Sequence, residues 1–343
     1  MYKLVRPVLS ALAALAATSA VLAQTGDPVK VTVENYNRAE SDVSLAGIVK
    51  SGGFGKFEHA GFPTPLDKQF VIRPNRDTLY SNAVFDLDAG PVTIKIPDAG
   101  TRFMSLQIID EDRYSPAVYY GAGSYPLTKE KIGTRYILAS VRTLVDPSDP
   151  KDLEAVHALQ DAIKAEQPGG PGNFEVPNWD EASRLKVRSA LLTLAEGMNS
   201  KRMFGPREEV DPIKHLIGTA VGWGGNPENA ALCISVVPPK NDGTTIHTLH
   251  VPGDVPVDGF WSVSLYNANG YFQKNDYDAY SINNITAKKG DESSVDIQFG
   301  SCDGKIANCL PIMKGWNYTV RLYRPRASIL NGTWKFPDAR PTT

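Results

Sequence analysis

Two parts of the chain show the alternation of apolar and polar side chains that is typical of β-strands, and a helical stretch lies between them. In residues 317–324, for example, Tyr318, Val320 and Leu322 alternate with polar residues. Turn-forming pairs rich in Gly, Asn, Asp and Pro separate such segments. The strand-like segments are residues 69–73, 78–86, 91–97, 102–110 and 134–142 in the first part, and 231–238, 244–252, 259–268, 293–299 and 316–325 in the second. The pattern predicts a mainly β (α+β) fold, with two antiparallel, jelly-roll-like or sandwich-like β domains joined by a helical segment.

Helical spacing marks the remaining segments. Residues 31–50 and 152–166 carry apolar side chains three and four positions apart. Asn178, with Glu181 three residues later, has the form of a capping box and predicts a further helix that extends to about Lys201. The predicted organisation is a signal peptide (1–23), an N-terminal β domain (24–150), a helical segment (151–219) and a C-terminal β domain (220–343).

The N-terminus predicts export. Lys3 and Arg6 precede an apolar run over residues 8–23 that ends in small residues at Ala23, which is the pattern of a cleaved secretory signal peptide. A transmembrane helix is the alternative, but the run of about 16 residues is shorter than the ~20 needed to span a bilayer. We therefore expect a periplasmic or secreted protein without a stable membrane anchor.

Charge excludes one class of partner. The chain has a formal net charge of −2, and removal of Lys3 and Arg6 leaves 34 (36 − 2) basic against 38 acidic side chains, or −4. No basic cluster remains, which argues against nucleic acid as a partner.

The three cysteines divide into a pair and a single residue. Cys302 and Cys309 close a short loop, and in an oxidising compartment they predict a disulfide. A metal site is the rival interpretation, although no histidine lies close by and the spacing is not that of paired zinc ligands. Cys233 lies in an apolar run and is predicted to be a buried free thiol that packs as a small hydrophobic residue, with a nucleophile as the alternative.

The richest group of chemically active side chains lies in residues 69–85. Arg73 and Arg76 offer paired N–H donors for a carboxylate, phosphate or sulfate. Strand alternation places Arg76, Thr78, Tyr80 and Asn82 on one polar face and Asp77 on the opposite, core-facing side.

Three interpretations of this segment compete. Asp77 and Tyr80 are candidates for proton transfer, and a purely structural corner with an Arg–Asp pair is the main alternative. Asp77, Asp86 and Asp88 together offer oxygen ligands for a divalent cation, but their spacing does not specify one, so we predict no metal or cofactor.

Aromatic residues form a second candidate patch. Trp261, Tyr266 and Tyr271 are predicted to line a pocket, whereas Phe260 is assigned to the core. His247 and His250 are three residues apart in a strand-like segment, so they are expected on opposite faces rather than as metal ligands.

Several motifs resemble known families. The stretches at residues 35–41 (NYNRAES) and 75–81 (NRDTLYS), together with Arg142-Thr143 before Asp146-Pro147, resemble bacterial domain-of-unknown-function family 1254. The stretches at 222–225 (GWGG), 259–263 (GFWSV), 315–323 (GWNYTVRLY) and 332–334 (GTW) resemble family 1214. At residues 308–311 this chain has Asn-Cys-Leu-Pro where family 1214 members often carry Asn-Trp-Leu-Pro, which fits a disulfide at Cys309.

The resemblance covers almost the whole mature chain, in the order expected of the two families. It implies two jelly-roll-like β domains joined through helices, and a homo-oligomer. It implies no settled reaction. The positions that match the motif of family 1254, and that it therefore suggests as a site, are Asn75, Arg76, Asp77, Thr78 and Tyr80.

The sequence thus predicts a periplasmic, hydrolase-like enzyme for a small polar or anionic molecule. Arg76, with Arg73 or Arg38, would hold the anionic group, and Tyr80 and Asp77 would transfer protons. Asn75 and Thr78 would contact the substrate, and the aromatic patch would close the pocket. The alternative is a non-catalytic periplasmic protein that binds a ligand or assists envelope assembly.

Overall fold

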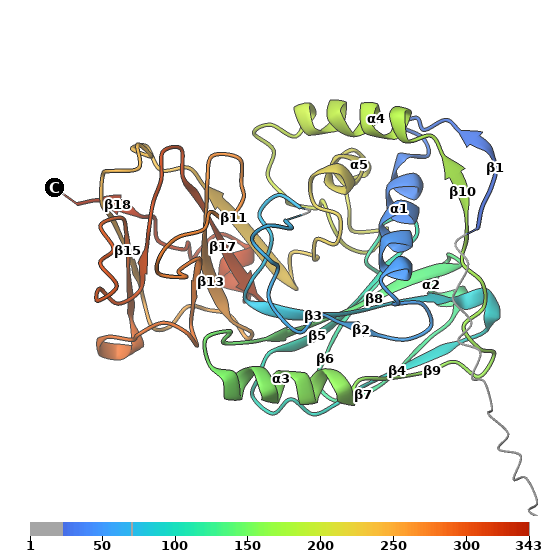
Figure 1. Ribbon diagram of the computed structural model, residues 1–343, viewed down its shortest axis with the longest axis horizontal. Coiled ribbons are helices and arrows are strands. Elements are labelled where there is room, and N and C mark those ends of the chain that lie inside the picture. Colours follow the sequence, from blue (N-terminus) through green and yellow to red (C-terminus); the bar gives the residue numbers. More distant parts are fainter. Residues whose placement is uncertain (1–22, 70, 343) are drawn as a thin grey trace, which may run out of the picture.

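The computed structural model describes residues 23–69 and 71–342, and it shows two β-rich bodies side by side (Figure 1). The predicted signal peptide therefore lies almost entirely outside the described residues. The mainly β, α+β prediction is confirmed. The first body contains a five-stranded antiparallel sheet in the order β2-β3-β8-β5-β6 and a three-stranded sheet in the order β7-β4-β9. Their strands are β2 (Glu58–His59), β3 (Thr78–Asp86), β8 (Tyr136–Leu144), β5 (Met104–Asp110), β6 (Ala117–Tyr120), β7 (Gly123–Leu127), β4 (Val92–Ile96) and β9 (Lys164–Glu166).

An apolar core holds these two sheets together. Phe85 and Val141 of the larger sheet pack with Val92 and Ile94 of the smaller one. The opposite face of the five-stranded sheet is covered by helices, which lie above it in Figure 1. These are α1 (Tyr36–Lys50), α4 (Glu181–Leu194) and α5 (Pro212–Val221). Each face of the large sheet is thus covered by one layer.

Smaller elements complete the first body. α3 (Pro150–Ala162) packs Val156 against Leu79 and Val145 at one end of the large sheet. The remaining elements are η1 (Leu87–Ala89), α2 (Lys129–Ile132) and the parallel pair β1 (Ala23–Val29) and β10 (Glu175–Trp179).

The second body is a sandwich of two four-stranded sheets. One sheet has the order β11-β17-β13-β14, and the other has the order β16-β15-β12-β18. The strands are β11 (Ala231–Val236), β17 (Asn317–Tyr323), β13 (Trp261–Tyr266), β14 (Ser281–Asn283), β16 (Cys309–Leu310), β15 (Val295–Phe299), β12 (His247–Val251) and β18 (Arg340–Pro341), with η2 (Asp291–Ser293) and α6 (Ala327–Leu330) beside them. The apolar core between the sheets includes Val263, Val320, Leu249 and Phe299.

The outer face of the sheet β11-β17-β13-β14 is polar. Directly paired residues share a face, so one row across four strands contains Cys233, Arg321, Ser262 and Asn283. The next row contains Ser235, Thr319, Ser264 and Ser281. We call this surface the polar face of the second body. Residues 73–77 of the first body hydrogen-bond to it.

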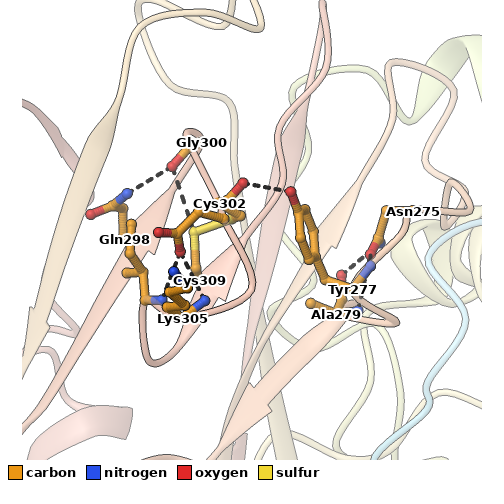
Figure 2. The surroundings of a disulfide bond; sticks show 10 residues. Asn275, Tyr277, Ala279, Gln298, Gly300, Cys302, Lys305 and Cys309 are labelled. Carbon is orange, nitrogen blue, oxygen red and sulfur yellow. Dashed lines mark hydrogen bonds between the residues drawn. A yellow bond between two sulfur atoms is a disulfide. The ribbon is translucent and has the colours of Figure 1, made fainter.

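A disulfide joins Cys302 and Cys309 and confirms the sequence prediction (Figure 2). The Tyr277 hydroxyl donates to the Cys302 carbonyl oxygen at 2.7 Å, and the Gln298 side chain donates to the Gly300 carbonyl oxygen at 2.9 Å. The bond therefore fastens the loop after β15 to the strand pair β15-β16.

Several local predictions are corrected. Residues 71–73 form bends and not a strand, because Arg73 and Pro74 bind the second body through their main-chain carbonyl groups instead of forming a ladder. The helix predicted from Asn178 begins after Asp180, whose side chain accepts from the Ser183 N–H, and it ends at Leu194. α5 was not predicted, although Asp211 caps it and Pro212 occupies its first turn.

Candidate functional site

The link between the two bodies is built on the backbone of residues 73–77. The buried guanidinium of Arg321 donates through Nη2 to the carbonyl oxygens of Arg73 (2.8 Å) and Pro74 (3.3 Å). The Tyr266 hydroxyl also donates to the Pro74 carbonyl at 2.7 Å. Arg73 has a φ of 53°, a left-handed conformation that turns its carbonyl out of any strand ladder. The buried Arg321 guanidinium therefore holds the segment before β3 against the polar face.

Asp77 forms a second link. Its Oδ1 accepts hydrogen bonds from Ser281 Oγ at 2.6 Å and from Asn283 Nδ2 at 3.2 Å. The residue is 1% exposed, and within the described chain its Oδ2 has no hydrogen-bond partner. Asp77 thus faces β14 of the second body.

Asn75 connects two tyrosines from different bodies. Its Nδ2 lies 3.2 Å from the hydroxyl oxygen of Tyr80 and 3.1 Å from that of Tyr323, and it also lies 3.0 Å from Thr78 Oγ1. Its Oδ1 accepts from the Asp77 N–H at 2.9 Å. Neither phenol donates to an acceptor within residues 23–69 and 71–342, where both hydroxyl oxygens accept from Asn75.

Arg142 lies at the centre of this group. It is paired directly with Tyr80 across β3 and β8, and its guanidinium carbon is 5.3 Å from the centre of the Tyr80 ring. Two side-chain nitrogens donate to Gln107 Oε1 (2.6 Å) and to the Gly224 carbonyl (2.9 Å). The 222–226 loop thus holds Arg142 in place.

The electrostatics of the two phenols differ. Burial raises the pKa of Tyr80, but the positive charge of Arg142 and the hydrogen bond from Asn75 outweigh it, so the pKa is lowered overall. Burial raises the pKa of Tyr323 well above its ordinary value, and the nearby Tyr80 raises it further. Tyr80 is thus the phenol that ionises first, while Tyr323 keeps its proton.

Cys233 differs from its prediction. It was expected to be a buried hydrophobic residue, but its side chain is exposed. It lies on the edge strand β11 in phase with Ser235, and therefore on the polar face, directly opposite Arg321. Burial among the surrounding atoms raises the pKa of the thiol above its ordinary value, and the charges of Arg321 and Arg142 oppose this rise without reversing it. We call Asn75, Tyr80, Arg142, Cys233, Arg321 and Tyr323 the interbody site.

The positive charge of this site is not neutralised by ion pairs. Across the described residues, no carboxylate lies within 4.0 Å of the side-chain nitrogens of Arg142 or Arg321. Both arginines are at least nine-tenths buried, with 6% and 5% exposure. A buried guanidinium without a carboxylate partner favours an anionic ligand, because the ligand would supply the missing charge.

The other predicted arginines have different surroundings. Arg38 of α1 hydrogen-bonds to Asp112 at 2.7 Å and lies 3.7 Å from Glu111, so it belongs to an ion-pair group outside the interbody site. Arg76 donates to the Thr64 carbonyl and lies 5.1 Å from the Tyr280 ring. The Arg73 side chain donates to Asn317 Oδ1 at 3.3 Å, toward the far end of the polar face.

The predicted aromatic patch is split by the strand alternation. Trp261 lies on the apolar face of β13, where its ring is 6.0 Å from Phe336. Tyr266 lies on the polar face but is fully buried beside Pro74. Tyr271 is half-buried in a turn closed by Asn267. The aromatic ring that packs on Arg142 is that of Tyr80.

The histidine pair is arranged as predicted. His247 is buried, and His250 is exposed and contacts Asp296 across the strand pair at 2.7 Å. In the described parts of the chain, no three His, Cys, Asp or Glu side chains are grouped so that they could hold a metal ion. None of the helices in residues 23–69 and 71–342 is long and apolar enough to cross a membrane.

The fold and site define a two-body β protein with an arginine–tyrosine site at the junction of the bodies. Residues 54–167 match the family model described as "Protein of unknown function (DUF1254)", and residues 239–327 match "Protein of unknown function (DUF1214)". The chain is therefore a member of these paired families, with DUF1254 before DUF1214.

Two solved structures are similar. The VPA0106 protein from Vibrio parahaemolyticus has 15% sequence identity and a TM-score of 0.69, with 91% of this chain and 98% of that chain covered. An uncharacterised protein from Burkholderia cenocepacia has 11% identity and a TM-score of 0.49, with 90% and 88% covered. No curated protein matches the chain. The first likeness confirms the fold.

Proposed function

We propose that this chain is an exported, hydrolase-like enzyme that acts on a small anionic molecule at the interbody site. The observation that carries the proposal is the pair of phenols, Tyr80 and Tyr323, joined by Asn75 and shifted in opposite directions in pKa. Two neighbouring titratable groups with opposite shifts are the usual arrangement for a base and an acid in one site.

Each group has a distinct role in this proposal. Arg142, together with Arg321, attracts the anionic part of the substrate, since no carboxylate among the described residues forms an ion pair with either guanidinium. The Tyr80 phenolate accepts a proton from the attacking nucleophile, because Arg142 favours the ionised form. Tyr323 remains protonated and donates a hydrogen bond to the oxygen that gains negative charge.

Export is supported by two independent features. The N-terminal residues have the sequence of a cleaved signal peptide. The Cys302–Cys309 disulfide is typical of proteins in oxidising compartments, and in a bacterium this favours the periplasm or the medium.

The test combines binding with turnover. Phosphate, sulfate, acetate and succinate are screened for an increase in melting temperature, and anionic esters, amides and phosphate esters are then screened for hydrolysis. Tyr80→Phe should lower kcat by ~10²- to 10⁴-fold. Tyr119→Phe is the matched control, because Tyr119 of β6 lies on the face of the five-stranded sheet opposite to that of Tyr80 and stacks on Tyr125. Wild-type turnover by the Tyr80→Phe variant would contradict the proposed chemistry.

A non-catalytic binding protein is the second candidate. The hydrogen bonds of the Arg321 guanidinium end on Ser264, Tyr266 and the carbonyls of residues 73 and 74, so part of the positive charge has a role in holding the bodies together. In this case anions would raise the melting temperature but no compound would be consumed.

A further inference from the structure

Cys233 has the surroundings of a reacting group. It is the one cysteine of the chain that is not in the disulfide, and its side chain is exposed in a row of polar residues. An exposed thiol in an oxidising compartment is open to oxidation, so packing alone does not explain its place. The adjoining residue on the same face of β11 is Ala231, which is small, apolar and not reactive.

A second polar group on the same row lacks a partner. Ser262 is paired with Arg321 from the other side, so Cys233 and Ser262 flank the same guanidinium on the polar face. Ser262 is fully buried, and its Oγ has no hydrogen-bond partner in the part of the chain that the structure describes. Buried hydroxyl groups are normally hydrogen-bonded, so this oxygen points to a ligand or an ordered water on the row.

The charges near the thiol suit an anionic reactant. Arg321 lies directly opposite Cys233, and the charge of Arg142 also acts on the thiol. Tyr323, two residues from Arg321 on the same face of β17, carries an uncommitted phenolic proton. Cys233, Arg321 and Tyr323 thus lie on one face of the second body, and the charge of Arg142 reaches the thiol from the first body. A nucleophile, two cations and a hydrogen-bond donor are the groups that attack on an acyl group requires.

We propose that Cys233 is the nucleophile of the interbody site and that it forms a thioester with the acyl group of a small, negatively charged ester. This inference rests on the proposed function and adds to it the bond that is cleaved and the class of substrate. The acyl group carries the anionic substituent, which Arg142 and Arg321 hold.

The steps balance in atoms and charge. The Tyr80 phenolate accepts the thiol proton as the sulfur of Cys233 bonds to the acyl carbon, and the carbonyl oxygen becomes an oxyanion that Tyr323 stabilises. The oxyanion then collapses, the ester C–O bond breaks, and the leaving alkoxide takes the proton from Tyr80. Water next attacks the thioester and gives its proton to Tyr80. The C–S bond breaks, and the thiolate recovers that proton. The sum is ester plus water to acid plus alcohol.

A labelling experiment tests the site without knowledge of the natural substrate. The full-length, disulfide-bonded protein is treated with iodoacetate, which is anionic, or with iodoacetamide, which is neutral, and alkylation of Cys233 is followed by mass spectrometry. The alkylation rate with iodoacetate divided by the rate with iodoacetamide should exceed the same ratio for free cysteine by about tenfold or more, because a positively charged site concentrates the anion. Arg142→Met should lower the ratio toward that of free cysteine.

A matched control places a cysteine elsewhere. The double variant Cys233→Ala, Ser124→Cys carries its thiol at an exposed position of β7 in the first body, far along the chain from the site. Its ratio should equal that of free cysteine. If Cys233 in the wild-type protein gave the same iodoacetate-to-iodoacetamide ratio as free cysteine, the inference would be overturned, whether or not any ester is hydrolysed.

Turnover separates this inference from the proposed function. 4-Nitrophenyl hydrogen succinate should give a burst of nitrophenol and a covalent adduct at Cys233, and neutral 4-nitrophenyl acetate should react at least tenfold more slowly. Cys233→Ala, or Cys233→Ser if the alanine variant does not fold, should abolish both burst and adduct. Hydrolysis that survives loss of Cys233 but requires Tyr80 would overturn the inference and leave the proposed function intact. Hydrolysis that requires neither would overturn both.

Discussion

Asn75 is the residue whose replacement tests the interbody site most directly. Its side chain is the hydrogen-bonding link between Tyr80 of β3 and Tyr323 of β17, and it also fixes the Asp77 N–H at the start of β3. We predict that Asn75→Ala both destabilises the protein and moves the pKa of Tyr80.

The magnitude follows from the hydrogen-bond geometry. Three oxygens lie within reach of Nδ2, but an amide nitrogen has only two hydrogens, so at most two of these bonds exist at once. The bond accepted by Oδ1 makes a third. At a net ~1 kcal/mol for each bond, Asn75→Ala should lower the free energy of unfolding by about 3 kcal/mol. The loss grows if the Asp77 N–H is left without water.

The assay is urea unfolding followed by tryptophan fluorescence and circular dichroism. Asn173→Ala is the control, because Asn173 is exposed, its side chain makes no hydrogen bond within the described residues, and its loss should cost less than ~0.5 kcal/mol. A phenolate titration by ultraviolet absorbance should also show the Tyr80 pKa rise toward its ordinary value, since a hydrogen bond that lowers it is gone. A loss below ~1 kcal/mol together with an unchanged Tyr80 titration would refute the central role given to Asn75.

Three further predictions concern single features. Replacement of Cys302 and Cys309 by Ala should cost about 2.5 kcal/mol in urea unfolding, because the disulfide closes a loop with a sequence separation of 7, and a cost near zero would contradict the loop-entropy argument. Burial raises the pKa of Asp42 to about 7, above its unfolded value of 3.8, so its stabilising contribution is present at acid pH and lost as the pH rises through 7. In thermal unfolding, Asp42→Asn should therefore be more stable than wild type at pH ~8 by roughly 1 kcal/mol or more, and similar to wild type at pH ~4. Ultraviolet titration should show one phenol that ionises before the others, absent in Tyr80→Phe and shifted upward in Arg142→Met.

The fold was largely readable from local patterns. The strand predicted over residues 78–86 has those same bounds in β3, because alternation and the preceding Pro74 fix both its faces and its start. The strands around residues 92–96 and 317–323 were also found. What failed was the strand at 69–73, where contacts with a segment more than 200 residues later replace local pairing.

The site was only partly readable. Tyr80 and Asn75 were predicted, and both lie in the interbody site. Cys233 was misjudged because its neighbours Leu232 and Ile234 suggested burial. Its position in the strand was informative all the same. Cys233 alternates with Leu232 and Ile234 and lies on the same face as Ser235, which marks that face as polar.

Arg321 and Arg142 were missed for a different reason. Both lie in stretches that resemble the two families, but nothing in the local sequence gives either arginine a role in a site. Their importance comes from the pairing of Cys233 with Arg321 and of Tyr80 with Arg142, and from the absence of a carboxylate near either guanidinium among the described residues. Strand register between distant segments cannot be read from one sequence, so the centre of the site could not be found.

The interbody site contains residues from both family regions. Tyr80 and Arg142 lie in the part that matches DUF1254, whereas Arg321 and Tyr323 lie in the part that matches DUF1214. Cys233 lies between the two matches.

Each region alone therefore lacks half of the phenol pair and one of the two cations. The contacts that hold the bodies together, from Arg321 to the carbonyls of Arg73 and Pro74, adjoin Asn75 in the chain. A displacement that separates the bodies would also break the hydrogen bond between Asn75 and Tyr323. The phenol pair that we propose for proton transfer would then be separated before either body unfolds, so the proposed activity should be more sensitive than secondary structure to any change at this junction.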